Sequence, residues 1–309
     1  MSGDAVINAF YSHDYCVRTR NGGMEKLAGV AEAAAQSPAI TIRDPGVIDV
    51  DHLFRLHDPA YVRDFLDGTP PLARSQNLPW SPALRTAVLA MQAGQLRATE
   101  AARCDGIAVN IANGFHHARH ARGSGFCTFN GLALVALAHP DYRVAVLDCD
   151  QHGGDGTEDF AARLPNLYNY SIFGTSFGCN GGVRSVIDPI EKGRNAERRY
   201  MAAVARACTQ IRAWQPDLLI YQAGVDCHMD DPLGRGPLSG AGLIQRDQRV
   251  FEFCRSEGLP VLVTLAGGYQ AFSRTVDLHM NTFEIAAAVY REGIGEPAVA
   301  GVAQPVADG

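Results

Sequence analysis

Two residues with metal-binding side chains, Asp150 and His152, stand two positions apart at the end of an apolar run. In an extended segment, residues two apart point to the same side, so this carboxylate and this imidazole can share one metal ion. Asp226 follows another apolar run and offers a third ligand. Three protein ligands with an open position are typical of catalytic zinc, and mixed Asp/His ligation also suits Fe²⁺ or Mn²⁺. The first pair alone also fits a polar strand end, but together with Asp226 it predicts a metal site.

Two adjacent histidines, His116 and His117, form a second group able to do chemistry. Neighbouring side chains diverge, so the pair suits two proton-handling roles better than joint chelation of one ion. Each imidazole then needs an acceptor on its far nitrogen, which fixes the tautomer and raises the basicity of the ring. Asp148 and Asp155 are the nearby carboxylates without another predicted role. A His-His dipeptide by itself is equally compatible with a structural role.

The third group is the sequence Gly267-Gly268-Tyr269. The glycines allow a sharp backbone turn, and a tyrosine hydroxyl there can donate to a developing oxyanion. A half-buried loop aromatic is the alternative interpretation of Tyr269. With the metal site and the histidines, however, the tyrosine completes the groups needed for metal-assisted attack of water on a carbonyl. One histidine would accept the proton and later return it to the leaving nitrogen.

The elements that must position these groups alternate between strands and helices, which predicts an α/β fold with a mainly parallel central sheet flanked by helices. Most of the apolar runs are continuous, as expected for strands covered on both faces. Helices are predicted from Ser81-Pro82 onward, over residues 200–214, and from Ser239 to Arg255 with Gly258 as the stop signal. Strands are predicted at residues 5–12, 106–112, 143–149, 167–173, 217–224 and 260–266.

In open parallel sheets, ligands bind beyond the carboxyl ends of the strands. The predicted strands that end near residues 112, 149, 224 and 266 run directly into the His-His, Asp-x-His, Asp226 and Tyr269 segments. One edge of the sheet should therefore collect all of the groups described above. We expect a single domain over residues 1–309, with its catalytic motifs within 113–269 and a C-terminal tail from about 296 to 309.

The composition indicates which partners and which cellular compartment to expect for the protein. The net charge of −6 and the absence of a basic cluster disfavour direct nucleic-acid binding. No apolar run approaches the ~20 residues that span a bilayer, and no secretory signal is visible. Eight cysteines without a Cys-x-x-Cys pair predict free thiols in a reducing cytoplasm. Lysine is rare, with only Lys26 and Lys192 against many arginines, which favours a bacterial source with a GC-rich genome.

Taken together, the motifs resemble those of the histone deacetylases and their bacterial deacetylase-like relatives, which have the arginase–deacetylase fold. The similarity extends over about residues 50–285, and residues 231–249 are most similar to class IV deacetylases and small bacterial enzymes. The segments that carry the resemblance are 56–62 (LHDPAYV), 113–130 (NGFHHARHARGSGFCTFN), 147–157 (LDCDQHGGDGT), 222–234 (QAGVDCHMDDPLG) and 265–269 (LAGGY).

The resemblance implies catalytic roles for five residues. His117 would be the general base and acid, with Asp155 as its partner. His116 would give electrostatic support and would pair with Asp148. Tyr269 would stabilise the tetrahedral intermediate.

The resemblance also implies binding roles. The three metal ligands predicted above would hold zinc, with Fe²⁺ as an alternative. Gly125 and Phe126 would line a narrow tunnel for the acylated amine. A structural potassium ion would be held by Asp148 and by backbone near Ser171 and the metal ligands.

The substrate implied by the resemblance is an N-acyl-lysine side chain in a protein or peptide. The alternatives are an acetylpolyamine or another acylated small amine, and, in a different class, a non-catalytic acyl-lysine binder. Arginase-like chemistry is disfavoured, because it needs two metals and the ligands complete only one site. Two positions depart from the family pattern, Gly153 and Thr128, and Gly153 predicts a looser loop before Asp155. The 67–80 segment is the candidate substrate-capping loop and matches no family motif.

Overall fold

The computed structural model describes residues 7–18 and 24–291. Its centre is one sheet of eight parallel strands in the order β2-β1-β3-β8-β7-β4-β5-β6. The strands are β1 Ile7–Phe10, β2 Ile40–Arg43, β3 Ile107–Asn110, β4 Val144–Asp148, β5 Leu167–Phe173, β6 Ser185–Pro189, β7 Leu218–Gln222 and β8 Val261–Thr264.

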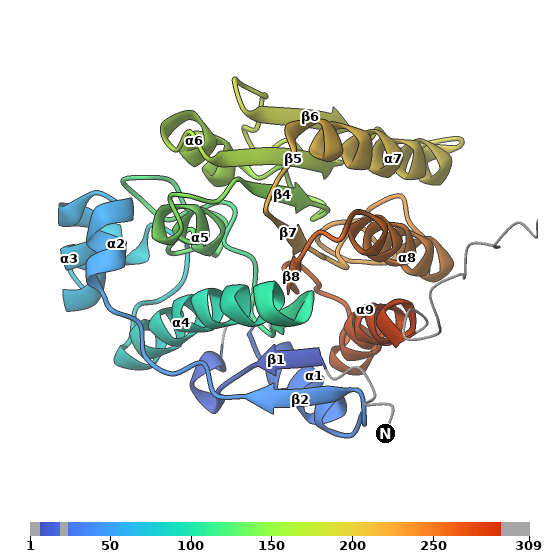
Figure 1. Ribbon diagram of the computed structural model, residues 1–309. Helices are drawn as coiled ribbons and strands as arrows, with labels where there is room; N and C mark the ends of the chain where they lie inside the picture. Colours follow the sequence, from blue (N-terminus) through green and yellow to red (C-terminus); the bar gives the residue numbers. More distant parts are fainter. Residues whose placement is uncertain (1–6, 19–23, 292–309) are drawn as a thin grey trace, which may run out of the picture.

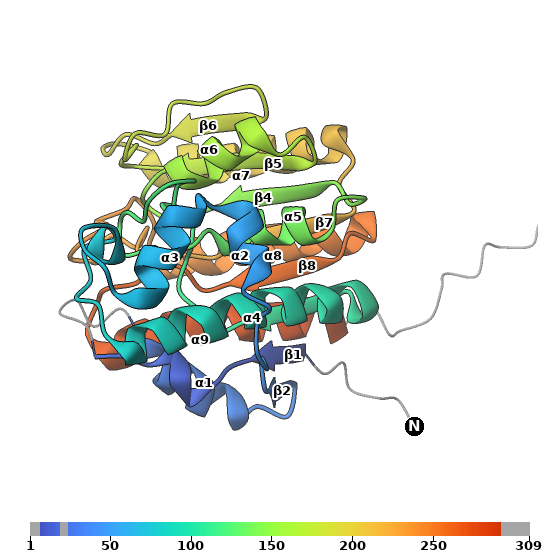
Figure 2. The same ribbon diagram turned by 90° about the vertical axis from the view of Figure 1, so that its left-hand side faces the viewer.

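Helices cover both faces of this sheet. Figures 1 and 2 show α4, α5 and α6 on one side, and α7, α8 and α9 on the other. The α-helices are α1 Lys26–Ala35, α2 Asp51–Leu56, α3 Pro59–Asp67, α4 Pro82–Asp105, α5 Gly131–Ala138, α6 Asp155–Arg163, α7 Ala196–Trp214, α8 Gly240–Glu257 and α9 Phe272–Arg291, and short 3₁₀ turns lie at η1 His13–Tyr15 and η2 Leu72–Arg74.

The predicted α/β fold with a parallel sheet is confirmed. Each of the six predicted strands corresponds to one in the structure, and in five of them the true ends lie one or two residues inside the predicted ones. Every residue of β3, β4, β5, β7 and β8 is buried, which explains their continuous apolar sequences. Strands β2 and β6 were not predicted from the sequence. Both are edge strands with partly exposed residues, so no uninterrupted apolar run marks them.

The predicted helix boundaries are set by the expected caps. The Ser81 hydroxyl accepts the backbone N–H of Leu84 at 3.1 Å and starts α4, with Pro82 as its first residue. Ser239 caps α8 in the same way, and Gly258 ends it with a φ of 60°. The tail predicted at 296–309 lies outside the described residues.

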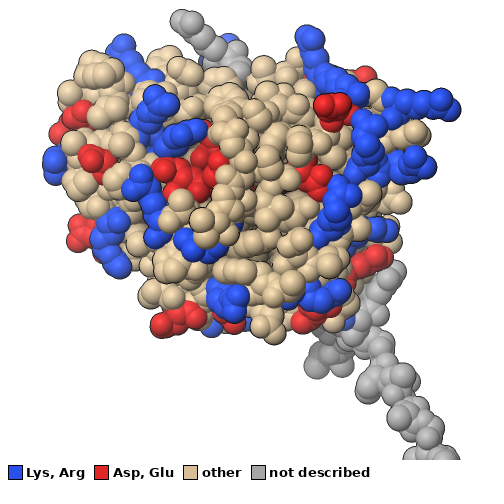
Figure 3. All heavy atoms as spheres, turned by 90° about the horizontal axis from the view of Figure 1, so that it is seen from above, with Lys and Arg blue, Asp and Glu red and all other residues tan. Residues whose placement is uncertain are grey.

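Two further features concern the surface. None of the helices within the described residues has the length and hydrophobicity needed to cross a membrane. On the face seen in Figure 3, basic side chains gather along one side with acidic side chains among them. On α7, Arg206 pairs with Asp188 and Arg212 pairs with Glu257 at 2.8 Å each. Acidic neighbours therefore partly neutralise the basic residues of this helix.

His57, just after α2, anchors the segment that carries the predicted histidine and tunnel motifs. Its Nδ1–H donates to the carbonyls of Arg119 (3.0 Å) and His120 (3.2 Å), and its Nε2 accepts the backbone N–H of Asn130 (3.1 Å). Its ring also packs against Phe129. The side chain is 1% exposed. This arrangement requires a neutral ring, because a protonated ring has no acceptor for the Asn130 N–H.

The burial of His57 predicts a loss of stability in acid. Burial lowers the pKa of His57 to about 4, whereas the unfolded chain takes up this proton near pH 6.5. The stabilisation is therefore complete above pH 6.5 and is lost as the pH falls towards 4, by about 3 kcal/mol in total. We expect urea unfolding to show a weaker acid dependence between pH 7 and 5 in His57→Gln than in the parent protein. Equal dependences would contradict this explanation.

Candidate active site

The predicted functional residues converge where the central strands end. Strands β3, β8, β7 and β4 are neighbours in the sheet, and a loop with a predicted motif follows the carboxyl end of each one. The His-His motif follows β3, the Asp-x-His motif follows β4, Asp226 follows β7 and Tyr269 follows β8. The parallel register alone thus brings together residues more than 150 positions apart in the chain.

Asp150, His152 and Asp226 form a compact cluster of atoms that could hold a metal ion. One ligand atom from each residue lies within 4.8 Å of the other two. The His152 Nδ1 is 3.1 Å from Asp150 Oδ1 and 3.1 Å from Asp226 Oδ2. The remaining carboxylate oxygens accept backbone N–H groups from Gly267 and Gln151. The backbone therefore fixes both carboxylates in an orientation where one oxygen of each faces the imidazole.

The electrostatics of this cluster suit a divalent cation. Asp150 and Asp226 are 3% and 0% exposed, so the repulsion between their two carboxylate charges is only weakly screened by water. Burial, and then the charge of Asp150, raise the pKa of Asp226 to about 7. Burial acts to lower the pKa of His152, but hydrogen bonds to the two carboxylates raise it to about 11. The site thus draws positive charge to the point between its three ligands, and an O, N, O donor set fits Zn²⁺ or Fe²⁺.

Glycines make this close approach of backbone and ligands feasible. A Cβ at Gly267 would lie 2.6 Å from Asp150 Oδ2 and would also collide with Asp226. A Cβ at Gly224 would lie 2.9 Å from the Asp150 Cα. Gly267 therefore allows the loop that carries Tyr269 to lie against the carboxylates of the candidate metal site.

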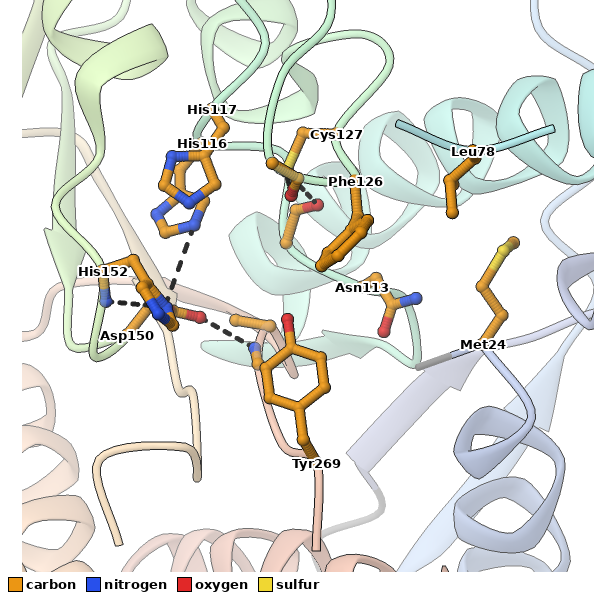
Figure 4. Close-up of a pocket in the computed structure, with 14 residues that line it drawn as sticks. Met24, Leu78, Asn113, His116, His117, Phe126, Cys127, Asp150, His152 and Tyr269 are labelled. Atoms are coloured by element: carbon orange, nitrogen blue, oxygen red, sulfur yellow. Dashed lines mark hydrogen bonds and ion pairs between the residues drawn. The ribbon is translucent and has the colours of Figure 1, made fainter. Parts of the chain in front are cut away.

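The two histidines each have a buried carboxylate partner. The His116 Nδ1–H donates to Asp148 Oδ2 at 2.8 Å, and the His117 Nδ1–H donates to Asp155 Oδ1 at 2.7 Å. In each ring the Nε2 atom lies on the side opposite the carboxylate partner. The His116 Nε2 is 3.9 Å from Asp150 Oδ1. Figure 4 shows the two rings side by side above the Asp150–His152 pair.

Their environments shift the two pKa values in opposite directions. For His116, burial opposes the charged form, but Asp148 and Asp150 raise the pKa to about 9. For His117, burial and then the charge of His116 lower the pKa to about 4. One ring is therefore protonated and the other neutral at neutral pH. A pair of titratable groups separated in this way is what acid–base chemistry requires.

A pocket with about 40 Å³ of free internal space opens onto these groups. It is lined by His116, His117, Asp150, His152 and Tyr269, as labelled in Figure 4. The third ligand of the metal cluster is not in the lining, because it lies behind the others and is fully buried. Among the described residues, the Tyr269 hydroxyl has no hydrogen-bond partner, so it is free to donate into the pocket.

The predicted tunnel residues, Gly125 and Phe126, also line the pocket. Gly125 has a φ of 50°, and a Cβ there would collide with the His117 ring. The Phe126 N–H donates to the carbonyl of Gln76 at 2.9 Å. Leu78, from the same 67–80 segment, is a further lining residue. The candidate capping loop thus contributes to the pocket wall and holds the tunnel phenylalanine in place.

Arg119 and Phe177 also contact this site, although their sequence positions did not predict it. Arg119 donates to Asp155 Oδ2 through Nε (2.8 Å) and Nη2 (2.7 Å), so the partner of His117 is held from both sides. The Phe177 ring lies 4.0 Å from the His117 ring and is 42% exposed. Phe177 follows the end of β5, so the strand-end rule could have identified it, whereas Arg119 gives no such signal.

The expectation of a loose loop at Gly153 is wrong. The Gly153 N–H donates to the carbonyl of Thr175, and its own carbonyl accepts the N–H of Asp155. A Cβ at this position would lie 2.5 Å from the Ser176 carbonyl oxygen. Glycine therefore permits tight packing here.

The potassium site stays a prediction. The Asp148 Oδ1 already accepts the N–H of Asp150 and the amide of Gln222, both at 3.1 Å. The Ser171 hydroxyl accepts the N–H of Gly154 at 3.2 Å.

Comparison with known proteins agrees with this geometry. The family model described as the histone deacetylase domain matches residues 23–283. An uncharacterised protein of Picosynechococcus sp. is 31% identical over 236 residues, which cover 74% of this chain and 78% of the relative. Histone deacetylase 2 of Arabidopsis thaliana is 32% identical over 59% of this chain and 49% of its own length. Acetylpolyamine amidohydrolase 1 of Pseudomonas aeruginosa is 29% identical over 50% of this chain and 48% of its own length.

The fold agrees as well. The crystal structure of an acetylpolyamine aminohydrolase from Burkholderia pseudomallei superposes with a TM-score of 0.79 and 21% identity, over 92% of this chain and 99% of that one. The matches to the named deacetylases span about half the length of those proteins. The fold and the site thus define an α/β protein of the arginase–deacetylase type with a hydrolase-like centre. The chain belongs to the histone deacetylase family.

Proposed function

We propose that this chain is a zinc-dependent amidohydrolase that removes the acyl group from N-acyl-lysine side chains, and that it works as a single domain. The observation that carries the proposal is the arrangement around one pocket: a three-ligand metal cluster, a neutral histidine beside a protonated one, and a free tyrosine hydroxyl. A non-catalytic acyl-lysine binder would not need this division of protonation states.

The roles of the residues follow from their chemistry. Asp150, His152 and Asp226 would hold the ion, which when bound polarises a carbonyl and lowers the pKa of water. His117 is neutral and takes a proton from the attacking water at Nε2, while Asp155 steadies its Nδ1–H. The same histidine then delivers this proton to the leaving amine nitrogen as the amide bond breaks.

Two other residues stabilise the negative charge that builds up on the substrate. The protonated His116 lines the same pocket beside His117, with ring centroids 3.9 Å apart, and its positive charge attracts the negative charge that develops on the substrate. Tyr269 donates its hydroxyl to the oxygen of the tetrahedral intermediate, which carries more charge than the substrate carbonyl does. Both contributions therefore favour the transition state over bound substrate.

The pocket lining supports lysine over polyamine as the amine. A polyamine carries further cationic nitrogens, and among the described lining residues only Asp150 has a carboxylate. The other walls include Met24, Leu78 and Phe126, which suit an aliphatic stem. All eight cysteines are free thiols, and we propose that the enzyme acts in the reducing cytoplasm.

A direct test is carboxylate release from lysine peptides that carry acetyl to long fatty-acyl groups, with acetylpolyamines alongside. Zinc-loaded protein is compared with protein stripped of metal by a chelator. Zinc-dependent release from the peptides supports the proposal. Release from acetylpolyamines alone would favour the second candidate, a polyamine deacylase. Metal binding without release from either substrate would contradict amidohydrolase activity on this substrate class.

The length of acyl group that the enzyme accepts should depend on a second cavity. A smaller space of about 30 Å³ adjoins the pocket and shares Met24, Leu78 and Phe126 with it. Its remaining walls are mostly apolar and include Val88 of α4. We expect Val88→Phe to reduce release of long acyl groups at least about tenfold relative to acetyl. The phenyl ring would fill the cavity, and a long acyl chain would then lose ~1.4 kcal/mol or more of apolar burial. The exposed Thr86→Phe on the same helix is the control, and an equal effect on both chain lengths would contradict the assignment.

A further inference from the structure

Lys26 is a charged side chain in an unexpected place. It is the first residue of α1 and only 2% exposed, although lysine is almost never buried without a partner. Its Nζ donates to the carbonyl oxygen of Ala266 at 2.6 Å and lies 3.5 Å from that of Gly268. Both acceptors belong to the loop that carries Tyr269. A residue near the N-terminus thus contacts the catalytic loop from 240 positions away.

This loop needs such support because its backbone is unusual. Ala266 has a φ of 58°, a left-handed conformation that costs energy for a residue with a Cβ. The N–H of Gly267 donates to Asp150 at 2.8 Å, and the N–H of Tyr269 donates to Asp231 at 2.7 Å. Carboxylates therefore hold the N–H groups of the turn, and within residues 7–18 and 24–291 Lys26 is the one charged side chain that contacts the carbonyls of Ala266 and Gly268.

Charge balance explains why this position carries an amine. Three buried carboxylates surround the loop: Asp150, Asp226 and Asp231. Burial lowers the pKa of Lys26, these carboxylates oppose the effect, and the result is about 8, so the amine is mostly protonated at neutral pH. A divalent ion at the metal cluster together with one ammonium group neutralises three carboxylates. The Nζ also lies 5.8 Å from the centre of the Tyr269 ring, within range of a cation–π attraction.

We propose that Lys26 is a positioning residue for Tyr269: by holding the carbonyls of Ala266 and Gly268, it fixes the tyrosine hydroxyl where the substrate oxyanion forms. This inference rests on the proposed amidohydrolase function for its kinetic consequence, but not for its structural one. Lys26 does not touch the substrate. It acts on the reaction only through the path of the 266–269 loop.

The test is a double-mutant cycle. Tyr269→Phe alone should lower kcat about 10²–10³-fold, the scale for one oxyanion donor. Lys26→Met keeps the length of the side chain and removes the amine, so it should lower kcat by a comparable factor, change KM much less and leave zinc content intact. The double variant should be no slower than Tyr269→Phe, because the hydroxyl that Lys26 positions is already gone. Additive losses in the double variant, or an unchanged kcat in Lys26→Met, would overturn the proposal.

Conservative and distant variants complete the design. Lys26→Arg keeps the charge and the donors and should retain kcat within about tenfold of the parent; a loss equal to that of Lys26→Met would contradict the role of the ammonium. The matched control is Lys192→Met, the same chemical change at the exposed second lysine, which should have no effect. If Lys26→Met does not fold, Lys26→Gln, which keeps a neutral donor, enters the same cycle.

A readout without turnover separates this inference from the proposed function. Amide hydrogen exchange of a peptide over residues 264–270 should accelerate in Lys26→Met, while a peptide over residues 144–149 stays protected. If the parent protein hydrolyses no acylated amine, the proposed function fails but the exchange result still tests the hold of Lys26 on the loop. Unchanged exchange at 264–270 would overturn the inference whatever the activity.

Discussion

Replacing Asp226 by asparagine is expected to abolish stoichiometric zinc binding and, with it, turnover. Loss of a mere hydrogen-bond partner of a ligand costs 10–100-fold in metal affinity, so loss of a ligand should cost on the order of 10³ or more. The metal-free protein should behave differently. There, burial and the charge of Asp150 oppose ionisation of Asp226, so the neutral amide should not lower the free energy of unfolding.

The measurements are zinc content after dialysis, zinc affinity by competition with a chromophoric chelator, and Tm with and without zinc. The parent protein should gain Tm with zinc and the variant should not, because only the parent has a folded-state site to stabilise. Asp230→Asn is the matched control: the same substitution in the same loop, at a side chain that is 77% exposed. Full zinc occupancy in Asp226→Asn would remove this residue from the ligand set.

The second large effect is expected at His117. Replacing it by alanine should lower kcat about 10²–10⁴-fold with zinc still bound, the range for loss of a general acid–base group. His116→Ala should cost less. The reason is the difference in protonation: at neutral pH His117 can accept a proton, whereas Asp148 and Asp150 keep His116 protonated.

The two alanine variants are therefore each other's control, since they remove the same side chain from adjacent positions. Steady-state kcat and KM are measured for both with zinc content checked in parallel. A larger loss of kcat in His116→Ala than in His117→Ala would reverse the assignment of the base. Equal losses would mean that the pair acts as one unit.

Much of the fold and site could be predicted from the sequence because the central strands are buried on both faces. Their continuous apolar sequences indicated where β3, β4, β7 and β8 lie, and the rule for ligands at strand ends then brought His117, Asp150 and Tyr269 to one edge. No separate information on the three-dimensional arrangement was needed for these residues, because each follows a strand directly.

The residues that escaped prediction depend on packing between distant segments. Lys26 reaches the site from α1, and no local pattern links it to a strand end. Strands β2 and β6 were not predicted for a related reason. Most of their side chains are partly exposed to water at the edges of the sheet, so their sequences contain no continuous apolar run. Strands buried on both faces could thus be predicted from the sequence, whereas partly exposed edge strands could not.

The separation of the pocket wall from the strand ends has an evolutionary consequence. The reacting groups lie in loops that directly follow the strands of the sheet, whereas Leu78 belongs to a connection between η2 and α4. Hydrogen bonds from Phe126 to Gln76 and from Gly123 to Ser75 join this connection to the tunnel segment. Connections of this kind accept insertions and replacements at low thermodynamic cost. Selection can therefore change which substrate enters while the reacting groups stay the same, so that a new substrate range arises by remodelling one loop.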